Sequence, residues 1–134
     1  MAIRFLLVAT ACVAVMLPLG TASAHHSFGA EFTRNRPIEV TGTVTKVEWM
    51  NPHARFYVEA TDKDGQKVTW NFELTTPNIL MRQGWTRHSL KPGDTVTVKG
   101  FGAKNGAHVG SASTVLLADG RRVFGQPQNS DSAK

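Results

Sequence analysis

Two adjacent histidines, His25 and His26, follow a run of small residues that ends in Ala22-Ser23-Ala24. Such a run is typical of a signal-peptidase cleavage site. Cleavage after Ala24 would make His25 the first residue of the mature chain, with a free α-amine beside its imidazole. Together these nitrogens can chelate a metal ion, and a planar set of nitrogen ligands suits Cu(II). The residues therefore predict a copper-binding amino terminus of the kind called a histidine brace.

A third ligand for this metal is expected from His53, in the segment Asn51-Pro52-His53, or from His26. His26 is the harder candidate, because a residue adjacent to His25 reaches the same metal only through a strained backbone or the intervening amide nitrogen. Glu73 is the carboxylate that we expect to orient His53. In the alternative interpretation, the paired histidines form a polar terminus and His53 hydrogen-bonds a carbonyl group in its turn.

The position of the cut decides the geometry of the metal site. Cleavage after Ala22 would leave Ser23-Ala24-His25 at the terminus, where the amine, two amides and an imidazole can wrap Cu(II) or Ni(II) in one plane. Cleavage after Ala24 gives the brace. Both cuts favour copper, so a copper ion is the one cofactor that we expect.

Catalytic motifs are missing from the sequence. It contains no Gly-x-Ser-x-Gly elbow, no His-Glu-x-x-His helix and no glycine-rich phosphate loop. The single cysteine, Cys12, lies in the predicted leader, so the mature chain has no thiol nucleophile and no haem attachment motif. We therefore do not expect an enzyme.

The first 24 residues are predicted to be a signal peptide. Arg4 is followed by an apolar run, Phe5–Leu17, which is too short to span a bilayer comfortably. The expected location is the periplasm or the outside of the cell, and no transmembrane segment is expected in the mature chain. Residues 25–125 are predicted to form one domain, and residues 126–134, with almost no apolar side chains, a disordered tail.

The net charge of the 134-residue chain is +5, and its basic residues are scattered, with no run longer than two. This distribution is typical of solvated surface charge and argues against a nucleic-acid partner. Another exported protein is the partner class that the sequence leaves open.

Alternating apolar residues predict a mostly β domain. The first strand follows Pro37, with a bulge or bend near Thr45-Lys46. Residues 27–36 are expected to form an arm that packs Phe28 and Phe32 onto the body. One short helix is expected, capped by Thr76, with an apolar stripe. The apolar stripe of this helix is Ile79, Leu80 and Met81. The further strands are expected at Ala54–Thr61, Gln66–Leu74, Thr95–Phe101 and around His108–Leu117, with a short Arg121–Phe124 segment after them.

Three curled strands, a helix and two more strands describe a five-stranded, partly open barrel of the OB type. Bending of the long first strand favours closure into a barrel over the alternative, a small β-sandwich. The predicted fold class is therefore all-β with one short helix.

The mature region also resembles a family of small exported bacterial proteins of uncharacterised function. The segments that carry the resemblance are His25-His26-Ser27-Phe28, Trp49-Met50-Asn51-Pro52-His53, Trp70-Asn71-Phe72-Glu73, Pro77–Trp85 and Leu90-Lys91-Pro92-Gly93-Asp94. The resemblance implies an exported β-rich domain and no established activity. Its motif includes histidines that match His25, His26 and His53, whereas His88 and His108 lie outside it.

The function that these residues favour is an exported, non-enzymatic metal-binding module that uses copper. The alternative is an exported module that binds a protein or a small ligand on the barrel, with the histidines incidental to it.

Overall fold

The computed structural model describes residues 28–125. The predicted leader, the predicted tail and both His25 and His26 lie outside these residues. Within the described part, the elements in chain order are α1 (Phe28–Glu31), β1 (Phe32–Glu48), β2 (Arg55–Thr61), β3 (Lys67–Glu73), α2 (Pro77–Arg82), β4 (Thr95–Ala103), β5 (Val109–Leu117) and β6 (Arg122–Gly125).

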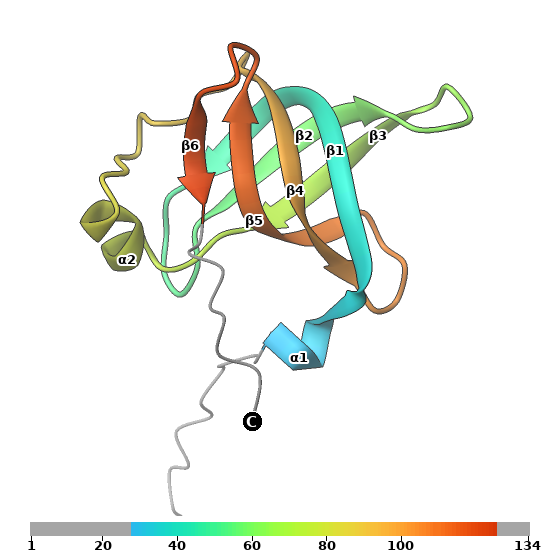
Figure 1. Cartoon of the computed structure of the whole chain (residues 1–134), viewed down its shortest axis with the longest axis horizontal. Helices are drawn as coiled ribbons and strands as arrows, with labels where there is room; N and C mark the ends of the chain where they lie inside the picture. Colours follow the sequence, from blue (N-terminus) through green and yellow to red (C-terminus); the bar gives the residue numbers. More distant parts are fainter. Residues whose placement is uncertain (1–27, 126–134) are drawn as a thin grey trace, which may run out of the picture.

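The strands form one sheet that curls into a ring (Figure 1). Their order is β3-β2-β1-β4-β5-β6, with antiparallel neighbours, and β3 also pairs in parallel with β5. That last pairing, Asn71↔Val109 to Glu73↔Ser111, joins the two sides of the ring. The predicted OB-like, partly closed barrel is confirmed, and the sandwich is not formed because a single sheet closes on itself. β6 is a sixth strand, added to β5 where only a short segment was expected.

The first strand is longer than the sequence suggested. The predicted irregularity is present, because the register with β2 shifts between Val44 and Lys46. The predicted packing of Phe28 and Phe32 onto the body is confirmed, because Phe32 is buried and the Phe28 ring contacts Phe101. The described part of the arm forms α1 and the beginning of β1. Phe32 pairs with Ala103 on β4 and is 3% exposed. The residues around Phe32 are mostly polar or charged and would by themselves stay in solvent. Burial of the Phe32 ring holds their backbone against the sheet and so extends the strand.

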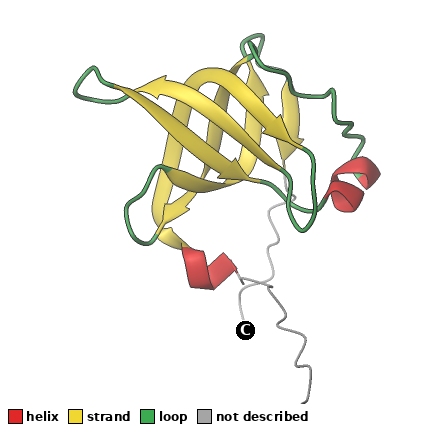
Figure 2. Cartoon of the chain, turned by 180° about the vertical axis from the view of Figure 1, so that it is seen from behind, coloured by secondary structure: helices red, strands yellow, loops and turns green. Residues whose placement is uncertain are grey.

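The helix α2 begins where the sequence places it. The Thr76 hydroxyl accepts a hydrogen bond from the Ile79 amide at 3.4 Å, and Pro77 occupies the first helical turn. The predicted apolar stripe is wrong, because Leu80 is fully buried while Ile79 and Met81 are 41% and 53% exposed. A six-residue helix turns too few times to bury more than one side of itself. In Figure 2, α1 lies below the strands and α2 lies to their right.

The hydrophobic core fills the inside of the ring. Its largest fully buried side chains are Phe56, Phe72 and Leu80, and the rings of Phe56 and Phe72 stack with centroids 5.3 Å apart. Trp85 closes the core near α2, as predicted, and is 6% exposed. The alternating residues of β2 and β3 that do not enter this core form an outer polar face.

Two glycines allow the strands to cross closely enough for the ring to close. A Cβ on Gly100 would lie 2.0 Å from the Ser111 carbonyl oxygen, and one on Gly42 would lie 2.2 Å from the Glu59 carbonyl oxygen. Side-chain atoms cannot approach backbone so closely. The backbones of β1 and β4 can therefore make these contacts only through glycine.

We predict that Gly100→Ala lowers the free energy of unfolding by about 1–3 kcal/mol, since the Ser111 backbone must shift to admit the methyl group. Urea denaturation of the purified domain measures this change. Gly29→Ala is the control, because a Cβ there meets no atom within 4 Å. An equal effect of the two substitutions would contradict the close-crossing argument.

Candidate functional site

Backbone hydrogen bonds beyond the ends of β2 and β3 fix the position of His53. The Ala54 amide donates to the Thr75 carbonyl at 3.1 Å, and the Leu74 amide donates to the Ala54 carbonyl at 2.9 Å. Within the strands, Arg55 pairs directly with Glu73. His53 points to the same face as Arg55 because side chains alternate along an extended chain. It therefore lies diagonally across from Glu73, within reach of a long side chain.

Glu73 is shared by two basic partners. Its Oε1 lies 2.7 Å from His53 Nδ1, and its Oε2 accepts a hydrogen bond from Arg55 Nη2. The Glu73 side chain is 13% exposed, against 30% for both His53 and Arg55. The carboxylate is therefore mostly withdrawn from water while the imidazole keeps an open edge.

This contact determines what the imidazole can do. A carboxylate only accepts hydrogen bonds, so Nδ1 of His53 carries the proton that Glu73 receives. In the neutral ring, Nε2 then has a free lone pair and becomes the ligand nitrogen. Carboxylates that orient metal-binding histidines in this way fix both the tautomer and the direction of the ring. Whether Glu73 does so for a metal stays a prediction.

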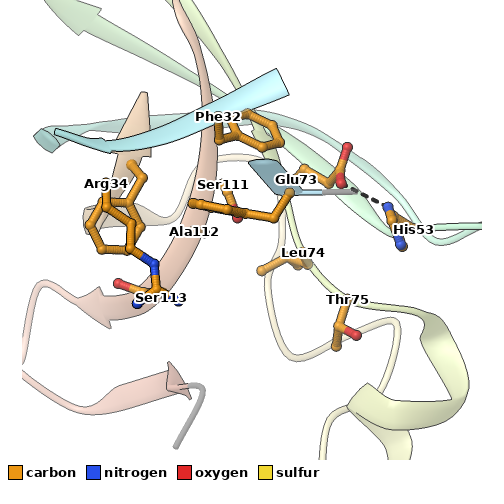
Figure 3. Close-up of a pocket in the computed structure, with 11 residues that line it drawn as sticks. Phe32, Arg34, His53, Glu73, Leu74, Thr75, Ser111, Ala112 and Ser113 are labelled. Atoms are coloured by element: carbon orange, nitrogen blue, oxygen red, sulfur yellow. Dashed lines mark ion pairs between the residues drawn. The ribbon is translucent and has the colours of Figure 1, made fainter. Parts of the chain in front are cut away.

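A pocket of about 410 Å³ lies beside this pair. The floor includes residues of β3 and β5 where the two strands join. One end holds His53 and Glu73, and Arg34 and Ser113 lie at the other end (Figure 3). The lining consists of Phe28, Phe32, Arg34, His53, Glu73, Leu74, Thr75, Phe101, Ser111, Ala112 and Ser113.

The described chain begins on the wall of this same pocket. The Phe28 ring contacts Phe32 and Phe101, with centroids 5.7 and 5.8 Å away, and the Lys104 amide donates to the Glu31 carbonyl at 3.0 Å. These contacts attach α1 to the end of β4. A pocket of this volume is roughly 9 Å across if spherical, and three extended residues span roughly 10 Å. The three residues that precede Phe28 are therefore long enough to cross to His53.

A second polar cluster continues along the outer face of the strands. The Tyr57 hydroxyl donates to Glu48 Oε2 at 3.1 Å, and the Lys46 ammonium pairs with Glu48. The hydrogen bond from Lys46 holds the pKa of the Glu48 carboxyl below its usual range, and the same contact raises the pKa of Lys46. Arg55, which pairs with Glu48 across the two strands, lowers the pKa of Glu48 as well, so this cluster and the Glu73 site share one arginine.

The structure brings two of the four predicted site residues together. His53 and Glu73 are in contact, while His25 and His26 lie outside the described residues. Within residues 28–125, no group of three or more His, Cys, Asp or Glu side chains could hold a metal. His108 lies elsewhere, with its ring 5.0 Å from that of Trp70.

Sequence reasoning missed Arg55 and Arg34. Arg55 could have been found by counting outward from the Asp64-Gly65 turn, because the register of a hairpin follows from its turn, and this register places Arg55 opposite Glu73. Arg34 carries no such signal. Its pocket is assembled from strands that are distant in sequence.

Comparison with known proteins places the chain as follows. A family model described as a family of unknown function (DUF6152) matches residues 11–112. No curated protein matches the chain. Among solved structures, the mitochondrial single-stranded DNA-binding protein Rim1 of S. cerevisiae aligns with a TM-score of 0.45 and 14% identity, over 65% of this chain and 94% of that one. We draw no functional conclusion from this neighbour.

Membrane-spanning helices were also sought. In the described residues, no helix combines the length and the apolar character that crossing a membrane requires.

We predict that Glu73→Ala lowers the free energy of unfolding by about 1–3 kcal/mol, because two partly buried basic groups lose their acceptor. Glu59→Ala is the matched control: Glu59 is also a strand glutamate facing a basic residue, Lys67, but its side chain is 44% exposed. Exposed pairs of this kind contribute about 0–1 kcal/mol. Chemical denaturation compares the variants, and a larger loss for the control would contradict this view of the site.

Proposed function

Since the chain belongs to a family of unknown function, we propose a function from its own residues: it is an exported, non-enzymatic module that binds one copper ion. The α-amine and imidazole of His25 chelate the ion, and Nε2 of His53 supplies the next nitrogen. His26 is the alternative source of that nitrogen. The module stores, delivers or senses copper outside the cytosol.

The observation that carries the proposal is the carboxylate-oriented imidazole of His53 on the pocket where the described chain begins. His53 Nδ1 is engaged by Glu73 at 2.7 Å, which directs the other ring nitrogen to a ligand. Phe28 and His53 line the same pocket, and an extended segment of three residues spans roughly 10 Å, which is about the width of this pocket. An amine and two imidazoles form a nitrogen set that suits Cu(II).

In this proposal, the role of the barrel is to hold the copper ligands near one another before the ion binds. Binding by three groups from separate parts of a chain costs the entropy of bringing them together. Here α1 is already attached to β4, and His53 is already oriented by Glu73. Such a partly prepared site binds more tightly than the same groups on an unfolded peptide.

We predict that the mature chain beginning at His25 binds one Cu(II), and that an added Gly-Ser before His25 weakens binding at least tenfold by removing the terminal amine from the chelate. His53→Ala and Glu73→Gln are expected to weaken it as well, the latter by about 10–100-fold. Competitive calorimetric titration measures the affinities.

His88→Ala is the control for this titration, because His88 is exposed and does not line the pocket. It should leave the affinity unchanged. Equal affinity of the mature and extended chains would remove the terminal amine from the proposal, and equal affinity of His53→Ala would remove the loop ligand.

We further predict that the protein isolated from its exported location has the intact mass of a chain beginning at His25, and that native mass spectrometry adds one copper. A chain beginning at Ser23 would place His25 third and replace the brace with the planar four-nitrogen chelate. A start at any residue after His25 would contradict both forms of the site.

A further inference from the structure

Two arginines near the start of β1, Arg34 and Arg36, differ in their hydrogen bonds. Arg36 is bound to the β4–β5 loop, where its guanidinium donates to the carbonyls of Ala103 at 2.8 Å and Gly106 at 3.2 Å. Arg34 lines the pocket and, among the contacts of the described residues, has no hydrogen bond or ion pair. Its five donors therefore remain available to a ligand.

The carboxylate of Glu73, which lines the pocket, does not pair with Arg34. Among the lining residues that the structure describes, Glu73 is the one carboxylate, and its two oxygens are engaged by His53 and Arg55. Arg34 lies at the opposite end of the pocket (Figure 3). The unbalanced charge of the pocket is therefore positive and lies at the Arg34 end.

The remaining surface of the pocket is suited to an apolar body. Phe28 and Phe101 meet edge to face at 5.8 Å and form an aromatic wall, and Leu74 and Ala112 contribute aliphatic surface. The Ser111 hydroxyl adds a polar group on β5. At about 410 Å³, the pocket lies within the roughly 300–1,000 Å³ range of small-molecule sites.

We propose that this pocket binds a small organic anion, a carboxylate carried on an apolar body of about one ring. The carboxylate pairs with Arg34, whose planar guanidinium matches it with two parallel hydrogen bonds. The apolar body packs against Phe28 and Phe101. None of these contacts involves a metal, so the inference does not require the copper proposal to hold, although both proposals use this pocket.

The test uses the mature chain beginning at His25, kept free of metal with a chelator, and 3-phenylpropanoate as the probe. Titration followed by NMR is expected to show saturable 1:1 binding. Arg34→Gln should raise the Kd at least tenfold, since a charge-assisted hydrogen bond is lost. Arg87→Gln, an exposed arginine that does not line the pocket, is the control and should leave the Kd unchanged.

The neutral analogue 3-phenylpropanamide tests the charge without changing the protein. It has the same body and should bind the unmodified chain at least tenfold more weakly. Equal binding of acid and amide would overturn the proposal, as would an unchanged Kd for Arg34→Gln. Absence of binding would also overturn it, including the case in which residues 25–27 fill the pocket themselves. The Arg34→Gln variant should still bind copper. Copper titration of this variant therefore distinguishes a failure of the anion site from a failure of the metal site.

Discussion

The parallel pairing of β3 with β5 closes the barrel, and the other features of the molecule depend on it. It involves three residue pairs and joins strands that lie more than thirty positions apart. Closure forces the strands to cross closely, which only glycine permits at Gly42 and Gly100. It also places Ser111 beside Glu73, so that two distant segments share one pocket floor. The constraint that completes the core therefore builds the site as well.

Burial on one side of the sheet explains the polar chemistry on the other. Phe56 and Phe72 stack inside the ring, so their strand neighbours Arg55 and Glu73 must face outward. There the carboxylate satisfies an arginine and a histidine at once. A half-buried acid with two basic partners holds all three groups in place. His53 is thereby a fixed imidazole on a loop, where a solvated side chain would sample many rotamers.

The pocket next to this imidazole combines two kinds of surface. Its His53 end is polar and already balanced in charge, and its Arg34 end carries a cation that has no ion pair with any of residues 28–125 and lies beside aromatic rings. The first end supports the copper proposal and the second supports an organic anion. Because both ends rest on the same closed barrel, a change that opens the ring would affect both. A change at one end would leave the other intact.

Sequence alone determined the local structure: the alternation of the strands, the bulge after Val44 and the Thr76 cap. These features follow from contacts between residues close in the chain, which composition and period encode. It also identified His53 and Glu73 as a pair to inspect. The tertiary structure decided the rest, including the length of β1, the exposure of Ile79 and Met81, and the pocket itself. Those depend on which distant strands meet, and the place of Arg34 on the pocket wall follows only once β1, β3 and β5 enclose a common space.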